Sequence, residues 1–171
     1  HYSPRNSCAT GDNEFSGMTS LYALNTSCTA NTYPENKYFT SIFNRFKDAG
    51  YSTSSYHDLD STYYKRDVFH INMGSDVYYD GYALGMDFDP TNAYEWPNDV
   101  EFIDKSSKVF TKNKPFMAWL TTVTPHQPYD AYSTLGNKYF DLFSDTDYPD
   151  TLKRYMSKLK VTDDALGKLL T

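Results

Sequence analysis

The chain has 171 residues, which lies within the usual size range of a single domain, and no apolar run approaches the roughly 20 residues of a membrane span. Its 16 basic and 22 acidic residues give a net charge of -6 without a cluster of Lys and Arg, which argues against general binding to nucleic acid. Because 17 Tyr, 11 Phe and 2 Trp supply apolar area, we expect residues 1–171 to form a single folded unit.

Apolar spacing in the first half of the chain predicts alternating helices and short strands. Residues 37–49 place four apolar side chains, the first at Phe39, along one face of a helix that ends before a glycine. Residues 51–56 then favour a short strand that leads into a histidine. A second short helix is expected over 61–69 and a brief strand over 77–79.

The second half of the chain continues the same alternation. Asn98 followed three residues later by Glu101 predicts a helix that starts with a capping box. Residues 116–120 are the most apolar run and favour a central strand that is buried on both faces. A closing helix is expected from about Pro149 onward. Helices that alternate with strands indicate an α/β layer architecture.

Two of the four histidines directly follow predicted strands. In open α/β sheets ligands bind outside the carboxyl ends of the strands, so His57 and His126 are candidate site residues, although a loop histidine is often only solvated or structural. We interpret His1 as part of the terminus and His70 as lying on the solvent face or at the end of a helix.

The polar, glycine-containing stretch 8–16 precedes an apolar segment and is able to open a helix. A hydroxyl at a helix N-terminus is a plausible nucleophile toward phosphate, because free N–H groups and the dipole favour an incoming anion. The alternative is that Thr10 or Asp12 merely caps this helix. Cys8 and Cys28 either form one bridge or remain free thiols. Any leader or anchor is expected to lie outside this chain.

An ordered set of short motifs with matching gaps resembles the extracellular catalytic domains of lipoteichoic acid synthases. The set consists of Thr10–Phe15, Ser20–Tyr22, Asn36–Tyr38, Gly50–Tyr51, His57, Arg66–Asp67, Trp96, Asp99, Pro115–Phe116, Thr124–Tyr129 and Tyr155–Asp164. The resemblance implies the middle part of an alkaline phosphatase/sulfatase-like α/β domain, with a mixed or parallel central sheet flanked by helices. It also implies a phosphoglycerol transferase that passes glycerol phosphate through a covalent threonine intermediate.

Carried over by position, Thr10 matches the nucleophile of that family. His57, Arg66 and His126 match residues that line its phosphoglycerol pocket, and Tyr64 stands where the family usually has a tryptophan. The residue types agree with this chemistry, because an arginine can hold two phosphate oxygens and a histidine can donate a hydrogen bond or protonate a leaving group.

This sequence departs from the family pattern in two places. His57 is followed by Asp58-Leu59-Asp60, so the acidic pocket contact is either Asp58 or Asp60. The family also implies a divalent cation, Mn²⁺ or Mg²⁺, held by a glutamate before the nucleophile and by an Asp-His-Gly motif. Thr10 is the one ligand of that site matched here, so we expect the chain alone to be inactive.

The resemblance also implies the partners: phosphatidylglycerol as donor, and a glycerol-phosphate polymer or glycolipid as acceptor. It implies the extracellular face of a bacterial cell membrane, reached through segments outside this chain, or secretion. Alternatives are a phosphoethanolamine transferase, a sulfatase, or a non-catalytic fragment that binds anionic polymer. A sulfatase needs Cys or Ser followed by x-Pro-x-Arg, and Cys8 is followed by Ala9-Thr10-Gly11 instead.

Overall fold

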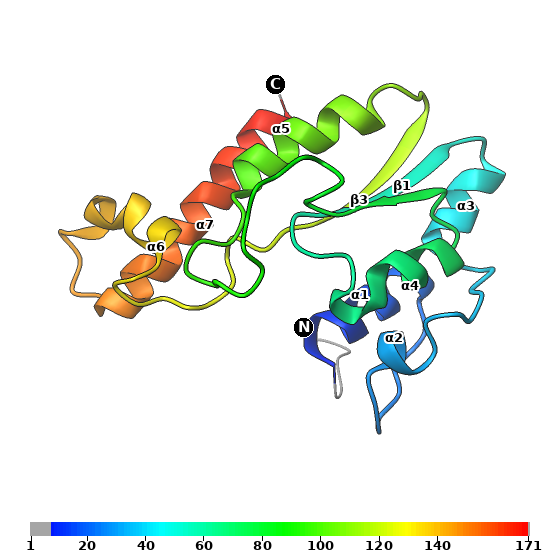
Figure 1. Ribbon diagram of the computed structural model, residues 1–171, viewed down its shortest axis with the longest axis horizontal. Helices are drawn as coiled ribbons and strands as arrows, with labels where there is room; N and C mark the ends of the chain where they lie inside the picture. Colours follow the sequence, from blue (N-terminus) through cyan, green and yellow to red (C-terminus); the bar gives the residue numbers. More distant parts are fainter. Residues whose placement is uncertain (1–7, 171) are drawn as a thin grey trace. The chain divides into compact units, whose positions relative to one another are not determined.

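The computed structural model of the chain describes residues 8–170 and groups them into two compact units (Figure 1). The first unit holds residues 8–56, 61–79 and 110–119 of the described range, and the second holds residues 57–60, 80–109 and 120–170. The expectation of one folded unit over residues 1–171 stays a prediction, and His1 lies outside the described residues.

The predicted helices of the first unit are present with shifted boundaries. The helices of this unit are α1 (Ala9–Thr19), α2 (Thr29–Thr32), α3 (Ile42–Asp48), a 3₁₀ turn (Tyr63–Lys65) and α4 (Arg66–Asn72), of which α2 is one that the sequence did not predict. The helix predicted over 37–49 begins only at Ile42, because the Ser41 hydroxyl caps it by accepting from the Asn44 N–H. The chain leaves α3 through Gly50, whose φ of +84° favours glycine.

The sheet has the strand order β2-β1-β3, with β1 at Ser52–His57, β2 at Val77–Tyr79 and β3 at Phe116–Thr121 (Figure 1). Strands β1 and β2 run parallel, with Ser54 opposite Val77. All three strands were predicted, but the expectation of a central, fully buried strand at 116–120 is wrong. Among residues 8–170, β1 has a neighbour on each side, whereas β3 has one and is half-buried along its length.

Polar side chains of β1 are hydrogen-bonded inside the first unit, which explains how a strand rich in Ser and Thr occupies the centre of the sheet. The Ser55 hydroxyl donates to the Ser75 hydroxyl at 2.7 Å, and the Thr53 hydroxyl donates to the Asp76 carboxylate at 3.0 Å. Because buried polar groups must be paired, these bonds make the central position possible.

The core of the first unit lies between its helices. Its members are Phe15, Met18, Ala30, Phe43, Phe69 and Met73. The ring of Phe15 lies 5.3 Å from that of Tyr38 and 6.1 Å from that of Phe69. Burial of each such aromatic side chain contributes roughly 1.5–3 kcal/mol, so α1 and α4 are held together mainly by this cluster.

The second unit is built around two long helices, α5 (Asp99–Phe110) and α7 (Asp150–Leu169), with α6 (Thr134–Lys138) and a 3₁₀ turn (Phe140–Phe143) between them in sequence. The Asn98 side chain caps α5, as predicted, but it accepts from the Val100 N–H at 2.9 Å and not from the Glu101 N–H of a capping box, and the Glu101 carboxylate lies 3.3 Å from Lys105 Nζ. Side-chain contacts join α5 to α7, among them Thr162 with Asp99 and Lys168 with Asp104. Within residues 8–170, no helix combines the length and apolarity needed to cross a membrane.

Candidate functional site

Thr10 lies exposed on the first turn of α1. The N-cap of this helix is Cys8, not Thr10, and the Asp12 carboxylate accepts from the Cys8 N–H at 2.8 Å. The first N–H groups of a helix have no partner within the helix, and the dipole gives this end partial positive charge. The Thr10 hydroxyl therefore lies at the end of α1 that favours an anion.

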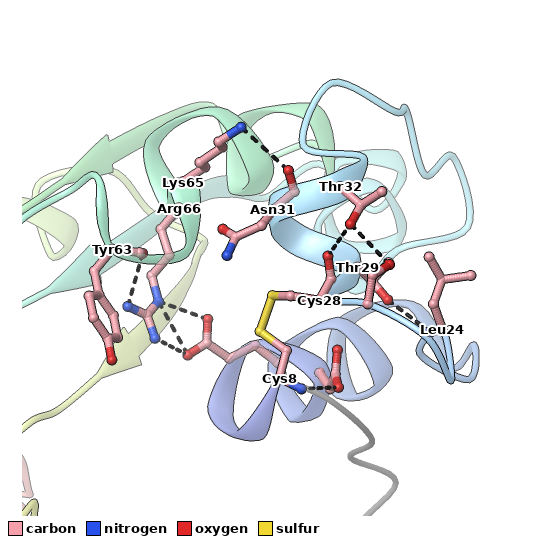
Figure 2. Close-up of a disulfide and its surroundings, with 12 residues drawn as sticks. Cys8, Leu24, Cys28, Thr29, Asn31, Thr32, Tyr63, Lys65 and Arg66 are labelled. Atoms are coloured by element: carbon pink, nitrogen blue, oxygen red, sulfur yellow. Dashed lines mark hydrogen bonds and ion pairs between the residues drawn. A yellow bond between two sulfur atoms is a disulfide. The ribbon is translucent and has the colours of Figure 1, made fainter.

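A disulfide between Cys8 and Cys28 joins the start of α1 to the start of α2 (Figure 2), which settles the open alternative in favour of a bridge. Next to it, Gly11 is closely packed. A Cβ atom at this position would lie 3.0 Å from the Cys8 sulfur and 3.3 Å from the ring of Tyr64. The absence of a side chain at Gly11 thus lets Tyr64 pack against the first turn of α1.

Arg66, which is labelled in Figure 2, is 2% exposed and makes a two-pronged ion pair with Glu14. Its Nη2 donates to Oε1 at 2.7 Å and its Nε donates to Oε2 at 2.9 Å. The guanidinium carbon lies 5.1 Å from the ring centre of Tyr64. Since Glu14 is four residues after Thr10, both lie on one face of α1, and the first unit brings Thr10, Tyr64 and Arg66 into one neighbourhood.

His70 completes this cluster: it lies in the last turn of α4, so the predicted helix-end position is confirmed, whereas the predicted solvent face is wrong. It is fully buried, with Nε2 3.3 Å from Glu14 Oε2. Burial raises the pKa of Glu14, but hydrogen bonds from His70 and Arg66 and the charges of both groups outweigh it, lowering the pKa from 4.5 to about 2. Glu14 was missed as a site residue, although its four-residue spacing from Thr10 matches the four-residue spacing of Arg66 and His70 on α4.

In the second unit, His57 is the last residue of β1, as the sequence predicted, and is 3% exposed. Its Nδ1 lies 2.9 Å from the main-chain oxygen of Thr121 and 3.3 Å from Oδ1 of Asp58. Because a carbonyl oxygen only accepts, Nδ1 of His57 carries a proton that it donates to Thr121.

Asp58 is fully buried and packs against a second buried carboxyl group, that of Asp99. Burial first, then the charge of Asp99 and a hydrogen bond with it, raises the pKa of Asp58 well above its ordinary value. The Thr162 hydroxyl donates to Asp99 Oδ2 at 2.6 Å, and the Val123 N–H donates to Asp58 Oδ2 at 3.1 Å. Asp60 is only half-buried, so burial favours it over Asp58 as the acidic residue that meets a ligand.

His126 lies in the loop after β3, on the surface of the second unit. Its Nδ1 lies 2.8 Å from the main-chain oxygen of Gln127, and its ring lies 5.1 Å from that of Trp96. Thr10, Tyr64 and Arg66 thus belong to the first unit, whereas His57 and His126 belong to the second. That all five residues meet in one pocket stays a prediction.

The described residues do not supply a complete metal site. Cys8, Asp12 and Cys28 form the one group of three or more His, Cys, Asp or Glu side chains within residues 8–170 whose ligand atoms all lie within 4.8 Å of one another. Both cysteines are in the disulfide, so neither offers a thiolate. Thr10 alone provides too few oxygen ligands for a divalent cation of the Mn²⁺ or Mg²⁺ type.

Comparisons with known proteins agree with this architecture. The chain is 26% identical over 159 residues to the lipoteichoic acid synthase-like protein YvgJ of Bacillus subtilis, which covers 92% of this chain and 25% of that protein. The crystal structure of the lipoteichoic acid synthase LtaP from Listeria monocytogenes superposes with a TM-score of 0.75 at 23% identity, over 96% of this chain and 40% of that one.

A protein of the alkaline phosphatase superfamily from Vibrio parahaemolyticus superposes with a TM-score of 0.62 at 16% identity, over 95% of this chain and 40% of its own. The chain therefore spans a quarter to two fifths of the length of these relatives, and its fold is the alkaline phosphatase/sulfatase-like α/β fold that the sequence predicted. The profile of the Sulfatase family matches residues 1–171. The chain belongs to the sulfatase family and resembles its lipoteichoic acid synthase-like members.

Proposed function

We propose that this chain carries the nucleophile and part of the substrate pocket of a phosphoglycerol transferase. In this reaction the Thr10 hydroxyl attacks the phosphorus of phosphatidylglycerol, the bond to the diacylglycerol oxygen breaks, and that oxygen takes up a proton. The threonine ester then transfers glycerol phosphate to a glycerol-phosphate polymer or a glycolipid. The reaction would take place at the extracellular face of a bacterial membrane, or in a secreted form of the protein.

One observation carries the proposal: the Thr10 hydroxyl is exposed on the first turn of α1, and Glu14, one turn further along the same helix, binds the Arg66 guanidinium. The helix end and the guanidinium both favour the negative charge of a phosphodiester. The Glu14 carboxylate accepts from Nε and from one hydrogen of Nη2, and the main-chain oxygen of Tyr63 accepts from one hydrogen of Nη1. A guanidinium has five N–H donors, and these contacts account for three of them.

A divalent cation would lower the pKa of the threonine hydroxyl in an enzyme of this type. The described residues do not hold one by themselves, so the transfer reaction is expected from the full-length gene product and not from residues 8–170 alone. Phosphoethanolamine transfer remains the second candidate, because it uses the same threonine and the same anion contacts and differs only in the headgroup.

The test is mass spectrometry of the full-length gene product after incubation with manganese and phosphatidylglycerol labelled in its headgroup glycerol. We expect a phosphoglycerol adduct on the peptide that contains Thr10, and no adduct in Thr10→Ala. The matched control is Thr26→Ala, which removes an exposed threonine hydroxyl elsewhere in the first unit.

The outcomes separate the candidate functions. An adduct that persists in Thr10→Ala would overturn the assignment of the nucleophile. An adduct formed only from labelled phosphatidylethanolamine would show the second candidate, and no adduct from either lipid would leave a protein that at most binds anionic polymer.

Arg66→Lys keeps the charge but loses the planar fork, so binding of glycerol phosphate should weaken by about 1–3 kcal/mol.

A further inference from the structure

We propose that Lys158, on the buried face of α7, is a positioning residue for His126, the loop histidine that the proposed function places in the phosphoglycerol pocket. The inference rests on that function, because it concerns how the chain holds a side chain that would meet the phosphate of the substrate. Lys158 and His126 both belong to the second unit. The ammonium group of Lys158 donates to the main-chain oxygen of His126 at 2.7 Å.

The burial of Lys158 is not explained by stability. The residue is 4% exposed, although lysine is rarely fully buried unless it is paired. Within residues 8–170 no carboxylate makes an ion pair with Lys158, and its ammonium group contacts a neutral main-chain oxygen and the ring of Tyr129, whose centre lies 5.7 Å away. A buried charge with such partners is costly, so an apolar side chain would be at least as stable at this position.

Three main-chain groups that flank the His126 side chain are held by hydrogen bonds. The His126 N–H donates to the main-chain oxygen of Val123 at 2.9 Å, and the Tyr129 hydroxyl donates to the main-chain oxygen of Pro125 at 2.8 Å. Lys158 holds the third group, the main-chain oxygen of His126 itself. Because peptide groups are planar, these bonds fix the peptide planes on both sides of His126 and thus the direction of its side chain.

The imidazole ring of His126 is held as well. Its Nδ1 lies 2.8 Å from the main-chain oxygen of Gln127, and because a carbonyl oxygen only accepts, Nδ1 donates in this bond. The ring centre lies 5.1 Å from that of Trp96, whose indole N–H donates to the main-chain oxygen of Pro90 at 3.1 Å. Nε2 is therefore the ring nitrogen that remains to meet a phosphate oxygen. Loss of the Lys158 contact would release the peptide plane that leads to Gln127.

Helix α7 is a firm support for this contact, because it is also tied to the start of the same loop. One turn beyond Lys158, the Thr162 hydroxyl donates to the Asp99 carboxylate at 2.6 Å, and Asp99 accepts from the Thr124 N–H at 3.1 Å. Residues one turn apart on α7 thus hold the loop at Thr124 and at His126. Displacement of an active-site group by about 1 Å can cost about 100-fold in rate, so such support matters for the reaction.

Lys158→Met tests the ammonium group, because it keeps an apolar stem and removes the donor. In the 171-residue chain, nuclear Overhauser effects between the ring protons of Trp96 and His126 should be present before the substitution and lost after it. The midpoint of urea unfolding should not fall, since replacement of a buried charge by an apolar side chain is often neutral or stabilising. The matched control is Lys160→Met, which removes a lysine of the same helix that pairs with Asp164 and should leave the ring contact unchanged.

Chemical rescue separates the ammonium group from packing. Both cysteines of the chain are in the disulfide, so Lys158→Cys introduces a single free thiol. In urea, its thiolate displaces bromide from bromoethylamine, which forms a C–S bond and rebuilds a side chain of the length of lysine with a terminal ammonium group. After refolding, this product should show the Overhauser effects between the two rings. Alkylation with bromopropane, which adds a chain of the same length without charge, should not restore them.

The effect on the reaction is measured in the full-length gene product. Lys158→Met should lower the rate at which the phosphoglycerol adduct forms on Thr10 by about 10- to 100-fold, and Lys160→Met should leave this rate unchanged. A ring contact that persists in Lys158→Met, or an adduct that forms at the unsubstituted rate, would overturn the positioning role and leave the transferase proposal intact. Absence of an adduct from the unsubstituted protein would overturn the transferase proposal, while the ring contact and its rescue would still support the positioning of His126 by Lys158.

Discussion

Replacing Glu14 with Gln removes the negative charge that faces two buried basic side chains. The substitution keeps the size of the side chain, but an amide accepts through one oxygen and places N–H hydrogens against the donors of Arg66. Arg66 is 2% exposed, so its charge would remain buried without its partner. We expect the first unit to lose a large part of its stability.

Two estimates of the magnitude agree. Removal of one partner from a buried ion pair costs about 3–5 kcal/mol. The pKa of Glu14 falls from 4.5 to about 2, which corresponds to about 3 kcal/mol at 1.36 kcal/mol per pKa unit. Because the folded-state pKa is lowered, this stabilisation is present above pH 4.5 and is lost as the pH falls toward about 2.

The assay is urea unfolding at pH 7 in a Trp96→Phe background, in which Trp119 reports on the first unit because it packs against the core cluster there. Glu14→Gln should lower the free energy of unfolding by about 3 kcal/mol. Glu35→Gln is the matched control, since Glu35 is exposed and its loss should change stability by less than about 0.5 kcal/mol. A loss below about 1 kcal/mol in Glu14→Gln would refute the reasoning.

Three further predictions concern stability. The pKa of Asp58 is raised in the folded state, so its contribution to the free energy of unfolding is full below pH 3.8 and is lost as the pH rises through the folded-state pKa. Asp58→Asn should flatten this decline of the free energy of unfolding with pH, as measured by urea unfolding followed through Trp96. Thr162→Val should lower the free energy of unfolding by about 1.5–3 kcal/mol, because it removes a hydrogen bond to the Asp99 carboxylate. Thr162→Ser keeps the hydroxyl and should retain most of this stability in the same assay. Reduction of the bridge between Cys8 and Cys28, which spans 20 residues, should cost about 3 kcal/mol by calorimetry, and thiol titration of the unreduced chain should detect no free cysteine.

Local structure could be predicted from the sequence because its signals are local. The apolar spacing after Pro149 predicted α7, and Asn98 predicted the start of α5, because helix periodicity and caps involve residues within a few positions of each other. The short strand before His57 was found in the same way. The ordered motifs also identified the fold and the family, which the profile and the superpositions support.

Only the tertiary structure decided which strand is central and which polar side chains are buried. The apolar run at 116–120 predicted a strand but not its place in the sheet, because the order of strands depends on which edges pair. The Ser- and Thr-rich β1 became central since its hydroxyls find partners that the sequence does not show.

The environment of the candidate residues was decided in the same way. Arg66 and Glu14 are 52 positions apart, and His70 and Glu14 are 56 apart. Asp58 and Asp99 are both fully buried and in contact, although aspartate is a residue type that sequence reasoning assigns to the surface. Residue types and their order therefore determined which chemistry this chain is able to carry. The packing of α1 against α4 decided which of those charges are paired, because the energy of a charge depends on burial and on partners distant in sequence.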